Sequence, residues 1–281
     1  MKRVEAAISI IDALPPPARG RAVLAGDWHG NTAWAMHVVA RTASLGIDTI
    51  VHVGDLGVLW PGDVGNTFTF KLQRELDRHG VRLFFVDGNH DAHTALRALP
   101  RDDAGFGVIR TKAKGGRRLD LIRWVPRGHR WTWPGTDGRL VRFGGLGGAF
   151  SVDHQHRRTG RDIWPLVEEV EPQDVELLGG DPLDVLVSHD CPDGPLLAST
   201  MQLDYDDEVR SLRSRNLLRR AVNTTRPALS FCGHWHQRRT FQIDHPDGPP
   251  TTVHVMNKDG EAGNWAVLDL ATLTAQESNG G

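Results

Sequence analysis

Five short polar motifs constrain the fold of this chain more than any other feature, because each follows an apolar run that we expect to be a buried strand. The first three runs are Arg21–Ala25, Thr49–Val53 and Val81–Val86, and stretches of helical character separate them. Strands and helices that alternate in this way form parallel sheets, which carry ligand sites at the carboxyl ends of their strands. The polar motifs are therefore expected to meet at one edge of an α/β structure. They are Gly26-Asp27-Trp28-His29-Gly30, Gly54-Asp55, Gly88-Asn89-His90-Asp91, Ser188-His189 and Gly233-His234-Trp235-His236.

The remaining elements follow from periodicity and from turn residues. Residues 106–145 contain short β-like runs between Gly and Pro turns, a pattern typical of antiparallel strands. The helices are predicted at Thr32–Leu45, Phe68–His79, Gln173–Leu178 and Tyr205–Val222. The later strands are predicted at Leu119–Val125, Leu140–Phe143, Val185–Val187, Leu229–Phe231, Thr240–Ile243, Thr251–Val255 and Trp265–Leu268.

We interpret residues 1–281 as a single domain with a motif core over 21–236 and a flexible tail over 273–281. The first seventeen residues read as a short helix or a loose arm, because Glu5, Asp12 and three prolines interrupt any export signal. No apolar run is long enough to span a bilayer. The only cysteines, Cys191 and Cys232, cannot form a disulfide framework, so the expected location is the cytoplasm.

The motifs combine imidazole and carboxylate groups, which are the ligands expected for manganese, iron or zinc. Asp27 and His29 are two residues apart, as are His234 and His236, and side chains at this spacing on an extended segment point the same way. Each motif alone is also an ordinary turn, since Asn and Gly both tolerate left-handed backbone. Five such motifs, each after an apolar run, are hard to explain as independent turns, and we therefore predict a metal site.

The order D-x-H, G-D, G-N-H-(D/E), H and G-H-x-H resembles the calcineurin-like metallophosphoesterase family, and the match runs from Arg21 to His236. The resemblance implies a two-sheet mixed β-sandwich flanked by helices, with four α/β/β/α layers. It also implies a binuclear metal centre, in which Asp55 bridges both ions and His90 is the catalytic residue near the scissile phosphate. By the same resemblance Asp27, His29 and His236 hold the first ion, and Asn89, His189 and His234 hold the second.

A weaker likeness concerns the substrate. The stretch 147–153 and the later Trp164-Pro165 resemble small bacterial and phage phosphodiesterase-like members of the family. We therefore expect a phosphodiesterase that acts on small substrates such as cyclic nucleotides, by in-line attack of a metal-bridging hydroxide. His90 is expected to protonate the leaving oxygen, and Asp91 to cap the following helix rather than to orient His90. The alternatives are a phosphomonoesterase or protein serine/threonine phosphatase, then a nuclease, and last a scaffold without activity.

Two divalent ions are the expected cofactors, with manganese favoured and iron, zinc, nickel and magnesium as alternatives. The polar loop after Gly144–Gly148 is long for a connector, and His154, Arg158 and Arg161 in it are candidates for gripping the phosphate. Gly144–Gly148 lacks the Lys-Ser/Thr of a Walker loop and is interpreted as close packing. His52, within a predicted strand, is interpreted as a core histidine.

The expected partner is a small phosphoester, with no membrane, and the sequence does not reveal the oligomeric state. Arginines over 117–130 interleave with Trp124, Trp131 and Trp133, a mixture that can bind nucleic acid. A second arginine cluster covers 210–220. We interpret both as ordinary charged surface, because the formal net charge of the chain is −2 and gives no general attraction to nucleic acid.

Overall fold

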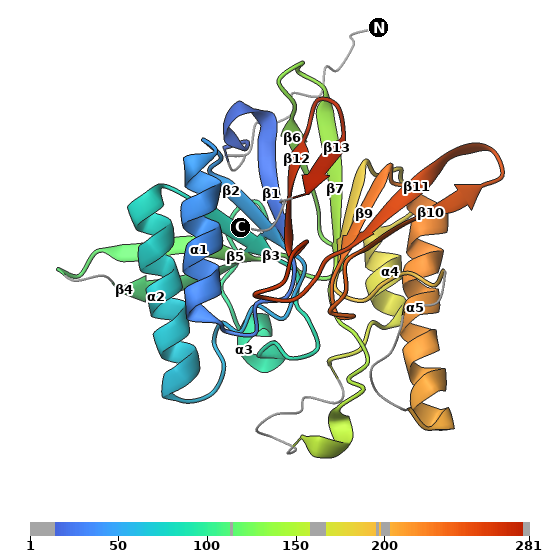
Figure 1. Ribbon diagram of the computed structural model, residues 1–281, viewed down its shortest axis with the longest axis horizontal. Helices are drawn as coiled ribbons and strands as arrows, with labels where there is room; N and C mark the ends of the chain where they lie inside the picture. The colour runs from blue at the N-terminus through green and yellow to red at the C-terminus, as the bar shows by residue number, and fades with distance from the viewer. Residues whose placement is uncertain (1–14, 113–114, 158–166, 195–196, 198–202, 278–281) are drawn as a thin grey trace, which may run out of the picture.

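The computed structural model describes residues 15–112, 115–157, 167–194, 197 and 203–277. Two mixed sheets stack against each other between helices, so that the described chain has four layers (Figure 1). Helices α1 and α2 cover the outer face of a seven-stranded sheet, and α4 and α5 cover the outer face of a six-stranded sheet. The predicted fold class is confirmed.

The seven-stranded sheet has the order β13-β12-β1-β2-β3-β5-β4. Strands β1, β2, β3 and β5 run parallel, whereas β12 pairs antiparallel with β1, and β13 forms the edge beyond it. Helices α1 (Thr32–Ser44) and α2 (Asp63–His79) form the crossovers between the first three strands. The strands are β1 (Arg21–Ala25), β2 (Thr49–His52), β3 (Arg82–Phe85), β4 (Gly107–Lys112), β5 (Arg118–Trp124), β12 (Trp265–Asp269) and β13 (Thr274–Glu277).

The six-stranded sheet has the order β10-β11-β9-β8-β7-β6, and its four central strands β11, β9, β8 and β7 run parallel. Its strands are β6 (Arg130–Pro134), β7 (Leu140–Leu146), β8 (Val185–Ser188), β9 (Leu229–Cys232), β10 (Arg239–His245) and β11 (Gly248–Val255). Helices α4 (Pro172–Leu178) and α5 (Tyr205–Thr225) connect them on the outside. The Asp204 side chain accepts a hydrogen bond from the backbone N–H of Asp207, and this cap fixes where α5 begins.

The strands read as continuous apolar runs because both of their faces are buried. Along β1, Val23 and Ala25 pack with the residues of α1 and α2, whereas Leu24 between them packs with the other sheet. Along β8, Val185 and Val187 likewise face the neighbouring sheet, and Leu186 faces the helices. This alternation separates three hydrophobic layers, two under the helices and one between the sheets. The carboxyl ends of both sets of parallel strands are thereby held side by side.

The predicted flexible tail is wrong over its described part. Thr274–Glu277 forms β13, which pairs with β12, and residues 278–281 lie outside the described residues. Leu273 and Ala275 pack against the layer between the sheets, so this polar-looking segment gains both hydrogen bonds and burial. The predicted N-terminal arm lies mostly outside the described residues. Strands β4 and β6 lie within the region 106–145 where antiparallel strands were expected but had no predicted range of their own, and the short helix α3 (His93–Arg97) was not predicted.

The middle of the chain buries its tryptophans and Arg127, whereas Arg117 and Arg118 stay exposed. Trp124, Trp131 and Trp133 are buried, so these rings are not available to stack on bases. Arg127 is buried against the Asp87 carboxylate, 2.7 Å away, and Arg123 pairs with Asp102. The glycines of 144–148 allow close packing as predicted: a side chain at Gly145 would lie 2.4 Å from Val125. Among the described helices, none is long and apolar enough to cross a membrane.

Candidate metal centre

All five motifs meet at the edge where the parallel strands of both sheets end. Asp27, Asp55 and Asn89 follow β1, β2 and β3 of the seven-stranded sheet. His189 follows β8, and His234 and His236 follow β9 of the six-stranded sheet. The expectation that the motifs share one edge is correct, and the edge is built by both sheets.

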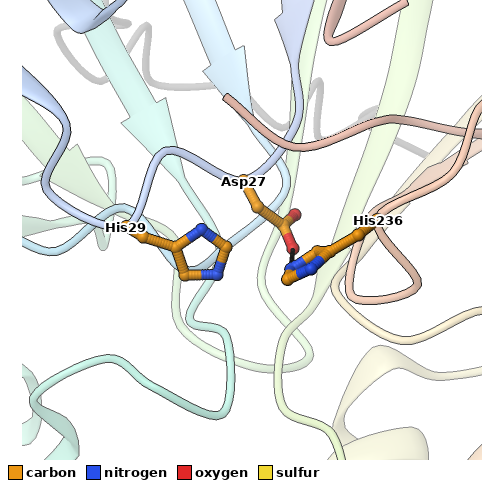
Figure 2. Close-up of side chains that lie close together, drawn as sticks. All are labelled: Asp27, His29 and His236. Carbon is orange, nitrogen blue, oxygen red and sulfur yellow. Dashed lines mark ion pairs between the residues drawn. The ribbon is translucent and has the colours of Figure 1, made fainter. Parts of the chain in front are cut away.

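The first group consists of Asp27, His29 and His236, whose ligand atoms all lie within 4.8 Å of one another (Figure 2). Nε2 of His236 lies 3.2 Å from Asp27 Oδ2. The rings of His29 and His236 are 4.8 Å apart between centroids. We call this group the first position. It is the set of residues that the family resemblance implies for the first ion.

The second group surrounds His189. Its Nε2 lies 2.9 Å from Asn89 Oδ1 and 3.5 Å from Asp55 Oδ2, and its ring centroid lies 5.2 Å from that of His234. We call Asn89, His189 and His234 the second position. Asp55 stands between the two positions, since its Oδ2 is also 3.4 Å from Nε2 of His29. Asp27, Asp55 and His189 form a further group whose ligand atoms lie within 4.8 Å of one another.

The backbone at these ligands is left-handed rather than extended. The φ angles are 44° at His29, 54° at Asp55, 65° at His234 and 51° at His236. Such angles are uncommon for residues other than glycine and are concentrated at functional sites. The expectation that an extended segment aligns each pair is therefore wrong. The turn instead separates His234 from His236, so that one faces the second position and the other the first.

Two glycines allow the carboxylates to reach the centre. A side chain at Gly88 would lie 2.1 Å from Asp55 Oδ1, and one at Gly233 would lie 2.0 Å from Asp27 Oδ1. Any larger residue would displace these carboxylates. The glycines before Asn89 and His234 are thus required by space at the site.

The ionisation of the clustered carboxylates and histidines indicates which ligands the site can bind. Asp27 and Asp55 are fully buried, and burial alone would raise their pKa values. Facing histidines outweigh that effect and hold both carboxyl pKa values below normal. Burial in turn opposes charge on the histidines, but Asp55 raises the pKa of His29 to about 9 and that of His189 to about 10. Two buried carboxylates thus draw positive charge into the cluster, and the nitrogen and oxygen donors around them fit divalent cations.

His90 lies beside the ligands and is held by its backbone. Its N–H donates to Asp55 Oδ1 at 2.8 Å, and its carbonyl accepts from the indole of Trp60 at 2.7 Å. The imidazole is 31% exposed, and its Nε2 lies 3.6 Å from Asp153 Oδ2. That distance is longer than a hydrogen bond, so a substrate oxygen can approach the ring.

Asp91 neither caps helix α3 nor orients His90. Helix α3 has Ala92 at its N-cap and no side-chain cap, so the predicted capping role is wrong. The buried carboxylate instead accepts hydrogen bonds from the backbone N–H groups of Asp55, Gly57 and Gly88, at 2.8 to 3.1 Å. Burial is the main cause that raises its pKa to about 6. Asp91 thereby ties together the two loops that carry Asp55 and Asn89.

Sequence reasoning missed Asp259, which lies in the loop after β11 and outside the motif core. Its Oδ1 is 3.4 Å from Nδ1 of His29, and its Oδ2 accepts a hydrogen bond from Asn31 at 2.7 Å. A carboxylate behind a metal-binding histidine orients the ring and raises its basicity. Lys258-Asp259-Gly260 reads as an ordinary turn, so the sequence holds no signal for this role.

The other candidates are placed as follows. Nε2 of His154 is 2.9 Å from Asp207 on α5, which engages one nitrogen of that ring. Arg158 and Arg161 lie outside the described residues. His52 is buried beside Trp28, in agreement with a core role. The indole of Trp235 donates to Asp190 at 3.0 Å and packs on the core under α5.

Comparison with known proteins gives one family and one fold. The family model described as calcineurin-like phosphoesterase matches residues 20–238. None of the curated proteins searched matches the chain. Among solved structures, the protein TT1561 of Thermus thermophilus superposes with a TM-score of 0.54 at 14% identity, over 93% of this chain and 99% of that one. A dimetal phosphatase from Danio rerio superposes with a TM-score of 0.53 at 14% identity, over 91% of this chain and 93% of that one.

Proposed function

Since this chain belongs to the calcineurin-like phosphoesterase family, we propose that it is a binuclear metal-dependent phosphodiesterase that acts on small substrates, with cyclic nucleotides as the favoured class. Membership implies metal-dependent hydrolysis of a phosphoester. The observation that carries the proposal is the convergence of seven candidate ligands from both sheets, with His90 standing outside them.

The candidate ligands divide between two cations. Asp27, His29 and His236 would hold one ion, Asn89, His189 and His234 the other, and Asp55 would contact both. When bound, such cations neutralise charge on the phosphoryl oxygens and lower the pKa of a water toward neutrality. Four of the donors stand in left-handed turns, and Asp91 fixes the loop of Asp55 through the backbone, so that geometry exists before the substrate arrives.

His90 is the group that we assign to the leaving oxygen. A departing ribose oxygen is a poor leaving group unless it receives a proton, and a positioned histidine can donate one. Its ring is exposed enough to meet a substrate, and its Nε2 lies 3.6 Å from Asp153 Oδ2. The hydrogen bonds at its backbone N–H and carbonyl hold the ring at a fixed place beside Asp55.

Among the described residues, the positive charge beside the site supports a diester. A phosphodiester carries one negative charge, whereas a monoester dianion carries two and benefits from further cations. Arg157, the arginine described in the segment that carries Asp153, is committed to Glu168 at 2.9 Å and to Ser151 at 2.5 Å. Within the described residues of this segment, the guanidinium is therefore not offered to a second phosphate charge.

The metal and the location are proposed on chemical grounds. Mixed nitrogen and oxygen ligands accept several divalent ions, and we propose Mn²⁺. Both cysteines are free thiols and buried, which is compatible with the cytoplasmic location that we propose.

The test is a substrate panel with added Mn²⁺ and a chelator control. It compares an aryl phosphodiester, an aryl phosphomonoester, 2′,3′- and 3′,5′-cyclic nucleotides and single-stranded DNA. We expect metal-dependent hydrolysis with the highest kcat/KM on a diester of low molecular weight. Asp55→Asn, purified in parallel, controls for contaminating phosphatases.

Two results would overturn parts of the proposal. Higher kcat/KM on the monoester than on every diester would replace the diesterase by a phosphomonoesterase. Preferred cleavage of single-stranded DNA would replace the small substrate by a nucleic acid.

A further inference from the structure

The side-chain amide of Asn89 is buried, and its two ends face different partners. Oδ1 lies 2.9 Å from Nε2 of His189, and Nδ2 donates a hydrogen bond to Ser151 Oγ at 3.0 Å. An amide presents an acceptor at one end and two donors at the other, and only the acceptor can bind a cation. The direction of this amide therefore decides whether Asn89 can serve the second position.

The neighbours of the Ser151 hydroxyl fix the direction in which it donates and the directions in which it accepts. It donates to Glu168 Oε2 at 2.5 Å, and it accepts from Asn89 Nδ2 and from Arg157 Nη1. A hydroxyl has one proton and two lone pairs, so these three contacts use its full capacity. Because the carboxylate of Glu168 takes the proton, a lone pair faces Asn89. A reversed amide would set two acceptor oxygens against each other.

A buried ion pair holds this hydroxyl. Glu168 and Arg157 lie 2.9 Å apart, with side chains that are 4% and 6% exposed. Burying two charges is costly, and such pairs are kept where they fix a particular geometry. The same guanidinium lies 3.6 Å from Asp153 Oδ1, and the other oxygen of Asp153 faces His90. One small cluster thus borders both the second position and the candidate proton donor.

We propose that Ser151 is a positioning residue that holds the Asn89 amide with its oxygen toward the second position, and that Glu168 sets the direction of the Ser151 hydroxyl. The proposal rests on the proposed function only in requiring two cation positions, and it does not depend on the substrate. Ser151 stands 62 residues after Asn89 and belongs to none of the five motifs.

The experiment is titration of the chelator-treated, full-length protein with Mn²⁺ in a calorimeter. The wild type is expected to bind two ions. Ser151→Ala is expected to keep the first ion and to weaken the second by about 10- to 100-fold, the usual effect of losing a group that orients a ligand. Ser151→Thr keeps a hydroxyl and is expected to restore the second ion. In hydrolysis, Ser151→Ala should lower kcat more than it changes KM.

Ser230 offers a matched control. Its hydroxyl is buried in β9 and has no hydrogen-bond partner among the described residues. Ser230→Ala therefore removes a buried serine hydroxyl from a parallel strand without touching Asn89. It is expected to bind both ions as the wild type does.

Glu168→Gln keeps Ser151 and tests whether Glu168 sets the direction of its hydroxyl. The new amide can donate to Ser151, which frees the hydroxyl proton to turn toward Asn89 and compete with the required orientation. We expect the second ion to weaken and the first to be retained, and thermal melting shows that each variant is folded.

Unchanged affinity for both ions in Ser151→Ala and Glu168→Gln would overturn the proposal, as would equal weakening of both ions. A wild type that binds a single Mn²⁺ would overturn it directly, because no second position would exist. A wild type that binds two ions and cleaves no phosphodiester would contradict the proposed function alone.

Discussion

The first and second positions differ in how deeply their ligands are enclosed. At the first, the side chains of His29 and His236 are 25% and 40% exposed beside the buried Asp27, whereas at the second Asn89 and His189 are almost fully buried and His234 is half-buried. The first is supported from the C-terminal loop by Asp259, and the second from within by Ser151 and Glu168. One centre thus combines an enclosed half with an accessible half. The enclosed half would hold its ligands in a fixed geometry, and the accessible half would exchange its ion and its solvent more readily.

The residue common to both halves gives the largest expected effect. Asp55→Asn removes the charge that stands between the two positions, so both ions should be lost on desalting. Activity on an aryl phosphodiester should fall by more than about 100-fold, beyond the usual effect of changing a supporting residue. Metal content and initial rate measure this. Asp247→Asn, at an exposed turn, is the control, and two retained ions at full rate would show that Asp55 is not shared.

A variant at His90 tests whether proton donation to the leaving oxygen can be lost while both metal positions are kept. His90→Asn should keep two ions and lose about 10²- to 10⁴-fold in kcat on alkyl phosphodiesters, which is the range of a general acid. An aryl diester has a better leaving group and should lose less. The ratio of the two rates is the measurement. Equal losses on both substrates, or loss of an ion, would contradict the role given to His90.

A change at Asp259 tests the opposite case, in which the first ion is weakened and the second is kept. Asp259→Asn removes the carboxylate behind His29 and should weaken the first ion by about tenfold or more, while the second ion stays. This is the mirror image of the effect expected for Ser151→Ala. Glu261→Gln, an exposed change in the same loop, should bind Mn²⁺ as the wild type does. Weakening of the second ion by Asp259→Asn would break the division into two halves.

The smallest effect that we expect is on the order in which the two ions leave the protein. On mild treatment with a chelator, the ion at the exposed first position should leave before the ion at the buried second position. Metal analysis against time should then show two steps of one ion each. Loss of both ions in a single step would mean that the difference in enclosure has no consequence for exchange.

Much of the fold could be predicted because the central strands are buried on both faces and therefore have continuous apolar sequences. Arg21–Ala25 was predicted with its observed bounds, and α1 to within one residue. The edge strands were harder. Strand β13 is polar and gains its order from pairing with β12, and β6, an edge strand of the six-stranded sheet, alternates Trp131 and Trp133 with less buried residues over only five positions. Such segments owe their structure to a neighbour far away in sequence.

The site could be predicted where residue type and position coincide in a short motif. The seven candidate ligands and His90 are brought together as the sequence indicated, although their metal roles stay predictions. The supporting residues could not be found, because Asp259 and Ser151 act across long separations and look like ordinary turn residues. The role of Asp91 was misjudged for the same reason, since its partners lie in another loop.

The origin of the ligands in both sheets also bears on how the chain reaches its native state. Asp27 and His236 face each other across more than two hundred residues of chain, and neither sheet alone contains a complete position. Contacts of such long range form late in folding, after the cost of closing the intervening loops has been met. A cation bound at this edge would cross-link the two sheets, and its binding free energy would add to that of folding. Metal supply would then strengthen a docking that the apolar layer between the sheets already provides.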